Sequence, residues 1–287
     1  MMKCVKSFKP YADLMRLNKP IGIMLLLWPT LWALWLASGG YPRLMLLFVF
    51  VLGVVLMRSA GCVINDLADR NLDAYVKRTC DRPLVSKRVS VGAAMILAGG
   101  LLLLAFGLVC LCNAATIRLA LVGAVLACGY PFLKRVTHLP QVGLGLAFSW
   151  GVPMAFAAVS GEVSLAAWYV FATAMLWPVI YDTMYAMADR EDDLNIGIKS
   201  TAILFGAHEK GILAVLQAVF VLMLMGMGVL FKLSFYYGVG VAVVIGLFVY
   251  QQWLIKDKKP IPCLAAFTNN HWVGFVIWIG ILVSEPR

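Results

Sequence analysis

The sequence predicts an all-α protein, a polytopic membrane bundle of nine transmembrane helices that forms one integral-membrane domain over residues 1–287. Two observations on composition and pattern lead to this fold class. Of the 287 residues, 62% are hydrophobic and 13% are charged, whereas soluble domains have about 45–50% apolar and about 25% charged residues. Charge-free stretches of roughly 20 residues, enough to cross a bilayer as a helix, recur along the chain. The stretches are continuously apolar, which argues against the alternating pattern of a membrane β-barrel.

Each predicted helix is a charge-poor stretch bounded by loop signals. The nine stretches are about 21–40, 44–65, 91–111, 116–133, 141–160, 164–185, 210–231, 235–255 and 263–283. The short segments SGGYPR, LCNAAT, SGEVS and FKLS connect consecutive helices on one side. A cleavable signal peptide is the alternative for the first stretch, but its tryptophans, Pro29 and the lack of a clear cleavage signature favour a retained helix.

The positively charged residues predict the orientation of the bundle. If the amino terminus and alternate loops face the cytoplasm, that side holds 19 of the 24 Lys and Arg residues. Loops rich in Lys and Arg stay on the cytoplasmic side of a membrane. We therefore expect a multi-pass protein of the cell inner membrane, with its amino terminus and active site in the cytoplasm. The net charge of +10 needs no nucleic-acid partner, and no obligate protein partner is inferred beside membrane lipid.

The first of two acidic stretches follows the second predicted helix and reads VINDLADRNLDAYVKRTCDRPL, residues 63–84. If the helix continues through this stretch, Asn65, Asp69 and Asp73 stand four residues apart. Each step then advances about 40° around the helix, so the three side chains share one face. We expect a stripe of oxygen donors at the cytoplasmic end of this helix.

The second acidic stretch reads YDTMYAMADREDDLNIGIKST, residues 181–201. Asp189 and Asp193 are again four residues apart, and Asp182 lies two turns earlier on the same face. Like charges at this spacing repel, so such a stripe weakens its helix unless a cation neutralises it. Carboxylate and amide oxygens suit Mg²⁺, and the absence of histidine from both stripes argues against zinc. The sequence predicts that both stripes converge on bound Mg²⁺.

Cationic residues accompany the two stripes and indicate an anionic ligand as well. The predicted diphosphate-binding residues are Lys77, Arg78, Arg82, Lys134 and Lys199. Carboxylates with Mg²⁺, lysine and arginine make the composition expected around a diphosphate, which leaves more readily when its charge is neutralised. Solvated charged loops that cannot enter lipid are the alternative. The two stripes share the same residue spacing, the same predicted side of the membrane and the same alignment on a helix face. This agreement favours a binding site over solvated loops.

Several motifs resemble those of the UbiA superfamily of intramembrane prenyltransferases. NDLADRNLD fits the Asn-Asp-x-x-Asp-x-x-x-Asp motif of that family, and DTMYAMADREDD looks like its second motif. The segments RLNKPIGIMLLLWPTLWALWLA, YPFLKRVTHLPQ, GIKSTAILFG and FTNNHWVGFVIWIGI resemble the bacterial branch that acts on 4-hydroxybenzoate. The resemblance covers nearly the whole chain.

This resemblance implies a Mg²⁺-dependent aromatic prenyltransferase of ubiquinone biosynthesis. Its substrates would be polyprenyl diphosphate and 4-hydroxybenzoate, and its product 3-polyprenyl-4-hydroxybenzoate, prenylated ortho to the hydroxyl. The family pattern assigns the metal ligands to Asn65, Asp66, Asp69, Asp73, Asp189 and Asp193, of which the four residues Asp69, Asp73, Asp189 and Asp193 are the expected catalytic set.

Two further residues are predicted to bind the acceptor. Arg135 matches the family position expected to meet the aromatic carboxylate. Tyr185 lies about 60° from the carboxylate face of its helix, where it either faces the prenyl cation or packs in the bundle.

Three alternatives remain at this point. A different acceptor, such as a naphthoate, homogentisate or haem, would keep the same motifs. A membrane alcohol phosphotransferase would carry an Asp-Gly…Ala-Arg core, which does not surround Asp69 or Asp73. A cation-coupled transporter would place its carboxylates near the membrane midplane beside broken helices, whereas these stripes lie at predicted helix ends.

Overall fold

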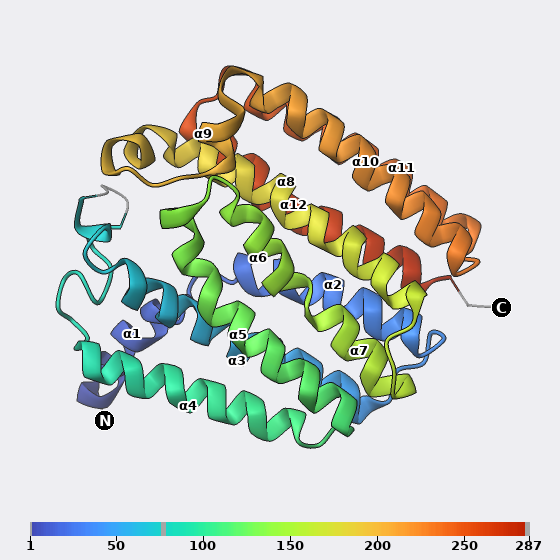
Figure 1. Ribbon diagram of the computed structural model, residues 1–287, viewed down its shortest axis with the longest axis horizontal. Helices are drawn as coiled ribbons and strands as arrows, with labels where there is room; N and C mark the ends of the chain where they lie inside the picture. The colour runs from blue at the N-terminus through green and yellow to red at the C-terminus, as the bar shows by residue number, and fades with distance from the viewer. Residues whose placement is uncertain (1, 76–78, 285–287) are drawn as a thin grey trace.

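The fold was analysed in a computed structural model, which describes residues 2–75 and 79–284. The described residues form twelve α-helices, three short 3₁₀ helices and no β-strand (Figure 1). The α-helices are α1 Met2–Leu14, α2 Ile21–Ala37, α3 Leu44–Asp69, α4 Val91–Val109, α5 Ala114–Val136, α6 Pro140–Ser149, α7 Gly151–Ser160, α8 Leu165–Ile196, α9 Thr201–Phe205, α10 Glu209–Leu230, α11 Phe235–Leu254 and α12 Pro260–Leu282. The 3₁₀ helices are η1 Asp73–Tyr75, η2 Gly206–His208 and η3 Ile255–Asp257.

The helical membrane architecture is confirmed. Seven helical stretches of the described chain are long and apolar enough to cross a membrane. α2 is a shorter apolar helix of 17 residues, and α12 has 23 residues without a charged side chain. Each of the nine predicted spans therefore corresponds to one helix, or to one pair of consecutive helices.

The predicted span at 141–160 is a pair of helices, because the helix breaks at Trp150 between α6 and α7. Pro153 lies in the first turn of α7 and has no N–H to donate to the carbonyl four residues earlier, at Ser149. Gly151 packs closely on α2, where a Cβ atom would lie 2.7 Å from Oγ1 of Thr30. The break thus lets this span approach α2.

α8 is longer than its predicted span and continues to Ile196. The hydroxyl of Ser164 caps its first turn by accepting a hydrogen bond from the backbone N–H of Ala167. Gly197 ends the helix with φ +73°, a left-handed conformation that glycine adopts without a steric penalty. One continuous helix therefore runs from the apolar core to the second acidic stripe.

Aromatic packing fixes α8 against α2 and α12. The indole N–H of Trp32 donates to the carbonyl of Gly274 at 3.0 Å, and that of Trp177 donates to Oδ1 of Asn270 at 3.0 Å. Gly274 has no room for a side chain, since a Cβ atom would lie 2.4 Å from Cδ1 of Trp28 and 2.5 Å from Cη2 of Trp177. The second stripe thus extends from a tightly packed part of the core.

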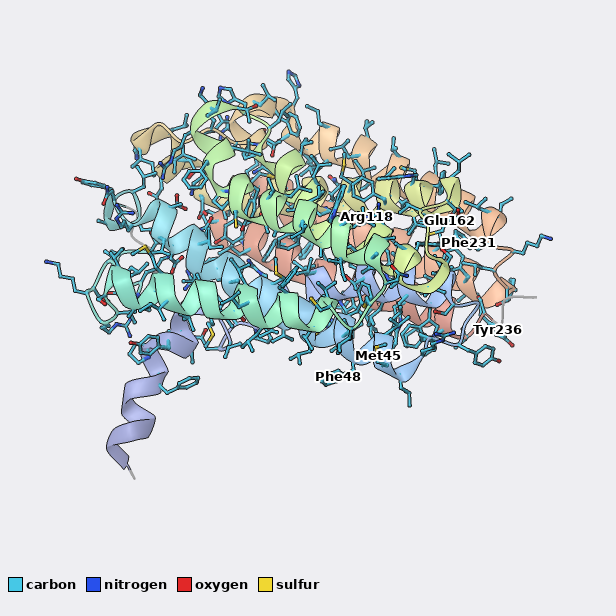
Figure 2. The ribbon with its side chains drawn as sticks, turned by 60° about the horizontal axis from the view of Figure 1, so that its bottom comes forward. Met45, Phe48, Arg118, Glu162, Phe231 and Tyr236 are labelled. Atoms are coloured by element: carbon cyan, nitrogen blue, oxygen red, sulfur yellow. The ribbon has the colours of Figure 1, made fainter. Side chains whose placement is uncertain are left out.

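The connections that carry the predicted site gather at one end of the bundle. In Figure 1 the N-terminus and α9 lie on the left, and the C-terminus lies on the right. Figure 2 shows Arg118, Glu162 and Tyr236 on the side away from α1. The alternation of loops between two ends, on which the predicted orientation depends, is therefore present in the fold.

Candidate active site

Asp69 is an acidic residue of the site with one paired and one open carboxylate oxygen. It is the last residue of α3 and is buried, with 1% of its surface exposed. Oδ2 pairs with the ammonium of Lys134 from the last turn of α5. Among residues 2–75 and 79–284, Oδ1 has no hydrogen-bond partner, and Nη2 of Arg135 lies 3.8 Å from it. A buried carboxylate oxygen left in this state is open to a further positive ligand.

Asp66 is also buried, but its carboxylate is fully engaged. Nη2 of Arg16 donates to Oδ1 at 2.9 Å and to Oδ2 at 3.2 Å. Nη1 of Arg82 lies 3.1 Å from Oδ1. The sequence pattern assigns Arg16 no role at the site, because nothing in the local sequence links it to a residue fifty positions later.

The prediction of one helical face through Asn65, Asp69 and Asp73 is wrong for Asp73. α3 ends at Asp69, and the backbone turns so that the N–H of Leu72 donates to the carbonyl of Asp69 at 2.8 Å. Asp73 begins η1 instead. Repulsion between carboxylates four residues apart disfavours a longer helix, and Arg82 holds Asp73 in its observed position.

Asp73 nevertheless belongs to the site, through Arg82. Nη1 of Arg82 lies 2.6 Å from Oδ2 of Asp73 and also contacts Asp66, so one guanidinium joins the two carboxylates. The hydroxyl of Thr79 donates to the backbone carbonyl of Asp73 at 2.9 Å. Burial raises the pKa of the Asp73 carboxyl above its usual range, and the charge of Arg82 offsets only part of this effect.

The second stripe lies on α8 as predicted. Asp182, Asp189 and Asp193 are all half-buried residues of this helix. Lys134, which pairs with Asp69, lies within electrostatic range of Asp182. Asp182 is also within range of Asp189. The positive charge of Lys134 thus pairs with the first stripe and also acts on the second.

Arg135 lines a surface pocket of about 610 Å³ between the ends of α3, α5 and α8. Its guanidinium lies over the ring of Phe132, 5.5 Å from the centroid, and donates to the carbonyl of Ala68. Apolar side chains and cations share the wall, which is formed by Ile64, Leu67, Ala68, Arg70, Asn71, Leu72, Phe132, Lys134, Arg135, Ile196, Gly197 and Ile198. A ligand with an apolar ring and a negative charge matches this lining.

The remaining predicted residues are placed less centrally. Lys77 and Arg78 lie outside the described residues. The ammonium of Lys199 donates to the carbonyl of Val136 at the C-terminal end of α5, at 3.0 Å. The ring of Tyr185 packs edge-on against Phe267, with centroids 5.0 Å apart, and lies within electrostatic range of Arg82.

The carboxylate and amide oxygens of the two stripes are ligands that suit a hard divalent cation, but they do not surround one common point in this structure. Within residues 2–75 and 79–284, no three acidic, histidine or cysteine side chains lie together closely enough to hold a metal ion. The open Oδ1 of Asp69 is the observation in favour, and half-buried Asn65 lies one turn before it on the same helix face. Both supply oxygen, the donor that Mg²⁺ prefers.

A cation that the sequence reasoning left unassigned lies deeper in the bundle. Arg58 is two turns before Asn65 on α3, and its Nε atom is buried without a hydrogen-bond partner among the described residues. Its guanidinium lies over the ring of Phe148 at 5.4 Å and packs against Gly22, where a Cβ atom would lie 2.4 Å from Nε. A charge inside a membrane span is itself a functional signal.

Comparison with known proteins decides the family. The sequence profile described as the UbiA prenyltransferase family matches residues 26–278. The chain belongs to this family. A protein of Coxiella burnetii named 4-hydroxybenzoate octaprenyltransferase is 53% identical over 275 residues, 96% of either chain. A protein of the same name from Alkalilimnicola ehrlichii is 54% identical over 96% of this chain and 94% of its own length.

Solved structures of UbiA proteins share the fold. The apo structure of a UbiA homologue from Aeropyrum pernix K1 superposes with a TM-score of 0.81 at 25% identity, over 91% of this UbiA chain and 97% of that one. A UbiA homologue from Archaeoglobus fulgidus bound to GPP and Mg²⁺ gives a TM-score of 0.73 at 20% identity, over 93% and 99%. The second likeness concerns the fold alone.

Proposed function

We propose that this membrane protein transfers a polyprenyl group from polyprenyl diphosphate to the ring of 4-hydroxybenzoate, ortho to the hydroxyl. The product would be 3-polyprenyl-4-hydroxybenzoate, an intermediate of ubiquinone biosynthesis. The observation that carries the proposal is Asp69, whose open Oδ1 lies among buried carboxylates and surplus cations at the mouth of the bundle. Relatives that match over nearly their whole length and are named for this reaction support it.

In the transfer, a C–O bond of the prenyl diphosphate breaks and a C–C bond to the aromatic ring forms. The C–O bond between the prenyl C1 and the diphosphate breaks, and its electron pair leaves with the diphosphate. The ring carbon ortho to the phenol forms a bond to C1, and the proton on that carbon then passes to solvent, which restores the aromatic ring. Lys134 and Arg82 neutralise the departing charge, so they stabilise the transition state more than the bound substrate.

We assign the metal to Mg²⁺, held by Asn65, Asp69, Asp73, Asp189 and Asp193. When bound, Mg²⁺ supplies charge neutralisation and orientation to the diphosphate oxygens. Oxygen-only donors and the open Oδ1 of Asp69 support this assignment.

Two arginines are candidates for the acceptor carboxylate. Arg135 lies at the pocket mouth over Phe132, where an aromatic ring can stack beside its guanidinium. Arg58 is buried further along α3 with Nε unpaired. We place the carboxylate at Arg135, because its pocket offers apolar side chains to the ring and cations to the carboxylate.

We place the protein in the cell inner membrane with the site facing the cytoplasm. The support is the distribution of charge, since 19 of 24 Lys and Arg residues fall in the amino-terminal segment and the loops at the site end of the bundle. Cysteine labelling of spheroplasts would test it. A cysteine introduced at Glu162 should react with an impermeant reagent from outside, and one introduced at Lys87 should not.

The function is tested in proteoliposomes with labelled 4-hydroxybenzoate, a polyprenyl diphosphate and Mg²⁺. We expect transfer that EDTA abolishes and Mg²⁺ restores, and that Asp69→Ala and Asp189→Ala each remove. Glu162→Gln, at the opposite end, is the matched control and should keep full activity. Intact prenylation in the two Asp variants would refute the two-stripe site. Transfer to a naphthoate but to no phenolic acid would refute the acceptor.

A further inference from the structure

Asp66 and Asp69 differ in what their carboxylates contact. Both side chains are buried, with 1% of each residue exposed. Both oxygens of Asp66 accept hydrogen bonds from guanidinium groups, of Arg16 at 2.9 and 3.2 Å and of Arg82 at 3.1 Å from Oδ1. Oδ1 of Asp69 accepts none from the part of the chain that the structure describes. A cation approaching Asp66 would have to displace an arginine, and a buried charge-assisted bond is costly to break.

The two arginines on Asp66 come from segments far apart in sequence. Arg16 lies in the link between α1 and α2, and Arg82 lies in the connection between η1 and α4. Arg16 has φ +58°, a left-handed conformation that is uncommon outside glycine. Such a conformation persists where surrounding contacts fix it, and the two bonds to Asp66 are contacts of this kind.

Arg82 extends the arrangement to the diphosphate site. The same Nη1 atom that contacts Asp66 lies 2.6 Å from Oδ2 of Asp73. Asp66, Asp73, Arg16 and Arg82 together hold two negative and two positive charges, so a positive charge becomes available to an anion when Asp73 turns to another partner. Because Asp66 holds Arg82 independently of Asp73, the guanidinium keeps its place when Asp73 turns to another partner.

We propose that Asp66 is a positioning residue, which holds Arg82 and Arg16 for the diphosphate and does not ligate the metal. Arg16 is then a further residue of the diphosphate site. The segment between α1 and α2, residues 15–20, borders that site. This inference rests on the proposed function and deepens it, because it separates the acidic residues of the first motif into two roles.

The test compares Asp66→Asn and Arg16→Ala with Asp69→Asn and Lys19→Ala, using the full chain in detergent. Lys19 is an exposed cation of the same link. Binding of Mg²⁺ and geranyl diphosphate is followed by the shift in thermal unfolding, with each titrated at saturation of the other. Chymotrypsin cleavage after Leu17, which is 40% exposed, reports whether the link has come loose.

We expect Asp66→Asn and Arg16→Ala to weaken geranyl diphosphate binding about ten-fold or more, the loss of one charge-assisted hydrogen bond. Their Mg²⁺ midpoint should stay at the wild-type value, and cleavage in the link should become faster. The double variant should be no worse than Asp66→Asn alone. Asp69→Asn should raise the Mg²⁺ midpoint without loosening the link, and Lys19→Ala should change neither binding constant.

A Mg²⁺ midpoint raised in Asp66→Asn as much as in Asp69→Asn would overturn the proposal, as would wild-type diphosphate binding in Arg16→Ala. If Asp66→Asn does not fold, Arg16→Ala decides, with Arg16→Lys expected to recover part of the binding. A wild-type protein that binds Mg²⁺ and geranyl diphosphate but transfers to no 4-hydroxybenzoate would refute the proposed acceptor and leave these binding measurements valid.

Discussion

Lys134 pairs through its ammonium with Oδ2 of Asp69, while Oδ1 of the same carboxylate accepts no hydrogen bond from any described residue. One oxygen thus anchors α3 to the end of α5, and the other remains open toward the site. Lys134 is also within electrostatic range of Asp182 on α8. The charge of this lysine therefore acts on carboxylates of both acidic stripes.

Lys134→Met should lower kcat/KM for the polyprenyl diphosphate by about 10- to 100-fold, since it removes one charge-assisted bond to the departing group and leaves Asp69 without its partner. Lys134→Arg should recover part of the activity. Steady-state kinetics at saturating acceptor measures the change. Lys210→Met, an exposed lysine at the start of α10, is the control; equal losses in the two variants would contradict a specific role.

Arg135→Ala and Arg58→Gln distinguish the two candidates for the acceptor carboxylate. We expect Arg135→Ala to raise the acceptor KM more than the diphosphate KM. Phenol lacks the carboxylate. With phenol as the acceptor, the variant that has lost the carboxylate-binding arginine should therefore have the same acceptor KM as the wild type. Kinetics of both variants with both acceptors measures this. If the increase in acceptor KM disappears with phenol for Arg58→Gln and persists for Arg135→Ala, the carboxylate binds at Arg58 inside the bundle and the assignment to Arg135 is wrong.

Glu209→Gln should destabilise the end of the bundle at the site. Glu209 is 1% exposed, and its Oε1 accepts from Arg190 at 3.2 Å and contacts Lys258 at 3.0 Å. Breaking a buried ion pair costs about 3–5 kcal/mol, and the lower end applies because both cations are partly exposed. Thermal unfolding in detergent measures the effect. Glu162→Gln, on an exposed loop, should unfold like the wild type.

Gly274→Ala should destabilise the protein, because the added Cβ would lie 2.4 Å from Trp28 and 2.5 Å from Trp177. Overpacking of this kind costs about 1–3 kcal/mol. The matched control is Gly100→Ala on α4, where a Cβ meets nothing within 4 Å and helix propensity predicts a gain of up to about 1 kcal/mol. Thermal unfolding of the two variants should move in opposite directions, and a stabilised Gly274→Ala would contradict the close packing.

Helical periodicity predicted the local parts of this site and missed the parts made by distant contacts. Asp189 and Asp193 share a face because α8 is a regular helix, and 3.6 residues per turn suffices to place them. Asp73 was misplaced because the helix ends four residues earlier at Asp69. Its observed position depends on Arg82, whose bond to Asp73 closes a loop that no periodic pattern describes.

Long-range pairs lie beyond the reach of sequence reasoning for the same reason. Arg16 and Asp66 are separated by fifty residues and meet only after α3 packs in the bundle. Pro153 alone did not predict the break at Trp150, because Pro29, Pro131 and Pro178 stand inside helices that continue unbroken. Arg58 was visible as a charge within an apolar stretch, and its unpaired Nε became evident only in the packed bundle.

The cationic partners of Asp66, Asp69 and Asp73 have a consequence for how the enzyme is made and loaded. Each of these buried carboxylates contacts an arginine or a lysine of the same chain. The bundle can therefore assemble in the membrane without first acquiring a ligand, because its acidic residues enter already neutralised. Substrate loading then becomes an exchange of partners, in which the diphosphate takes over cations that the carboxylates had held.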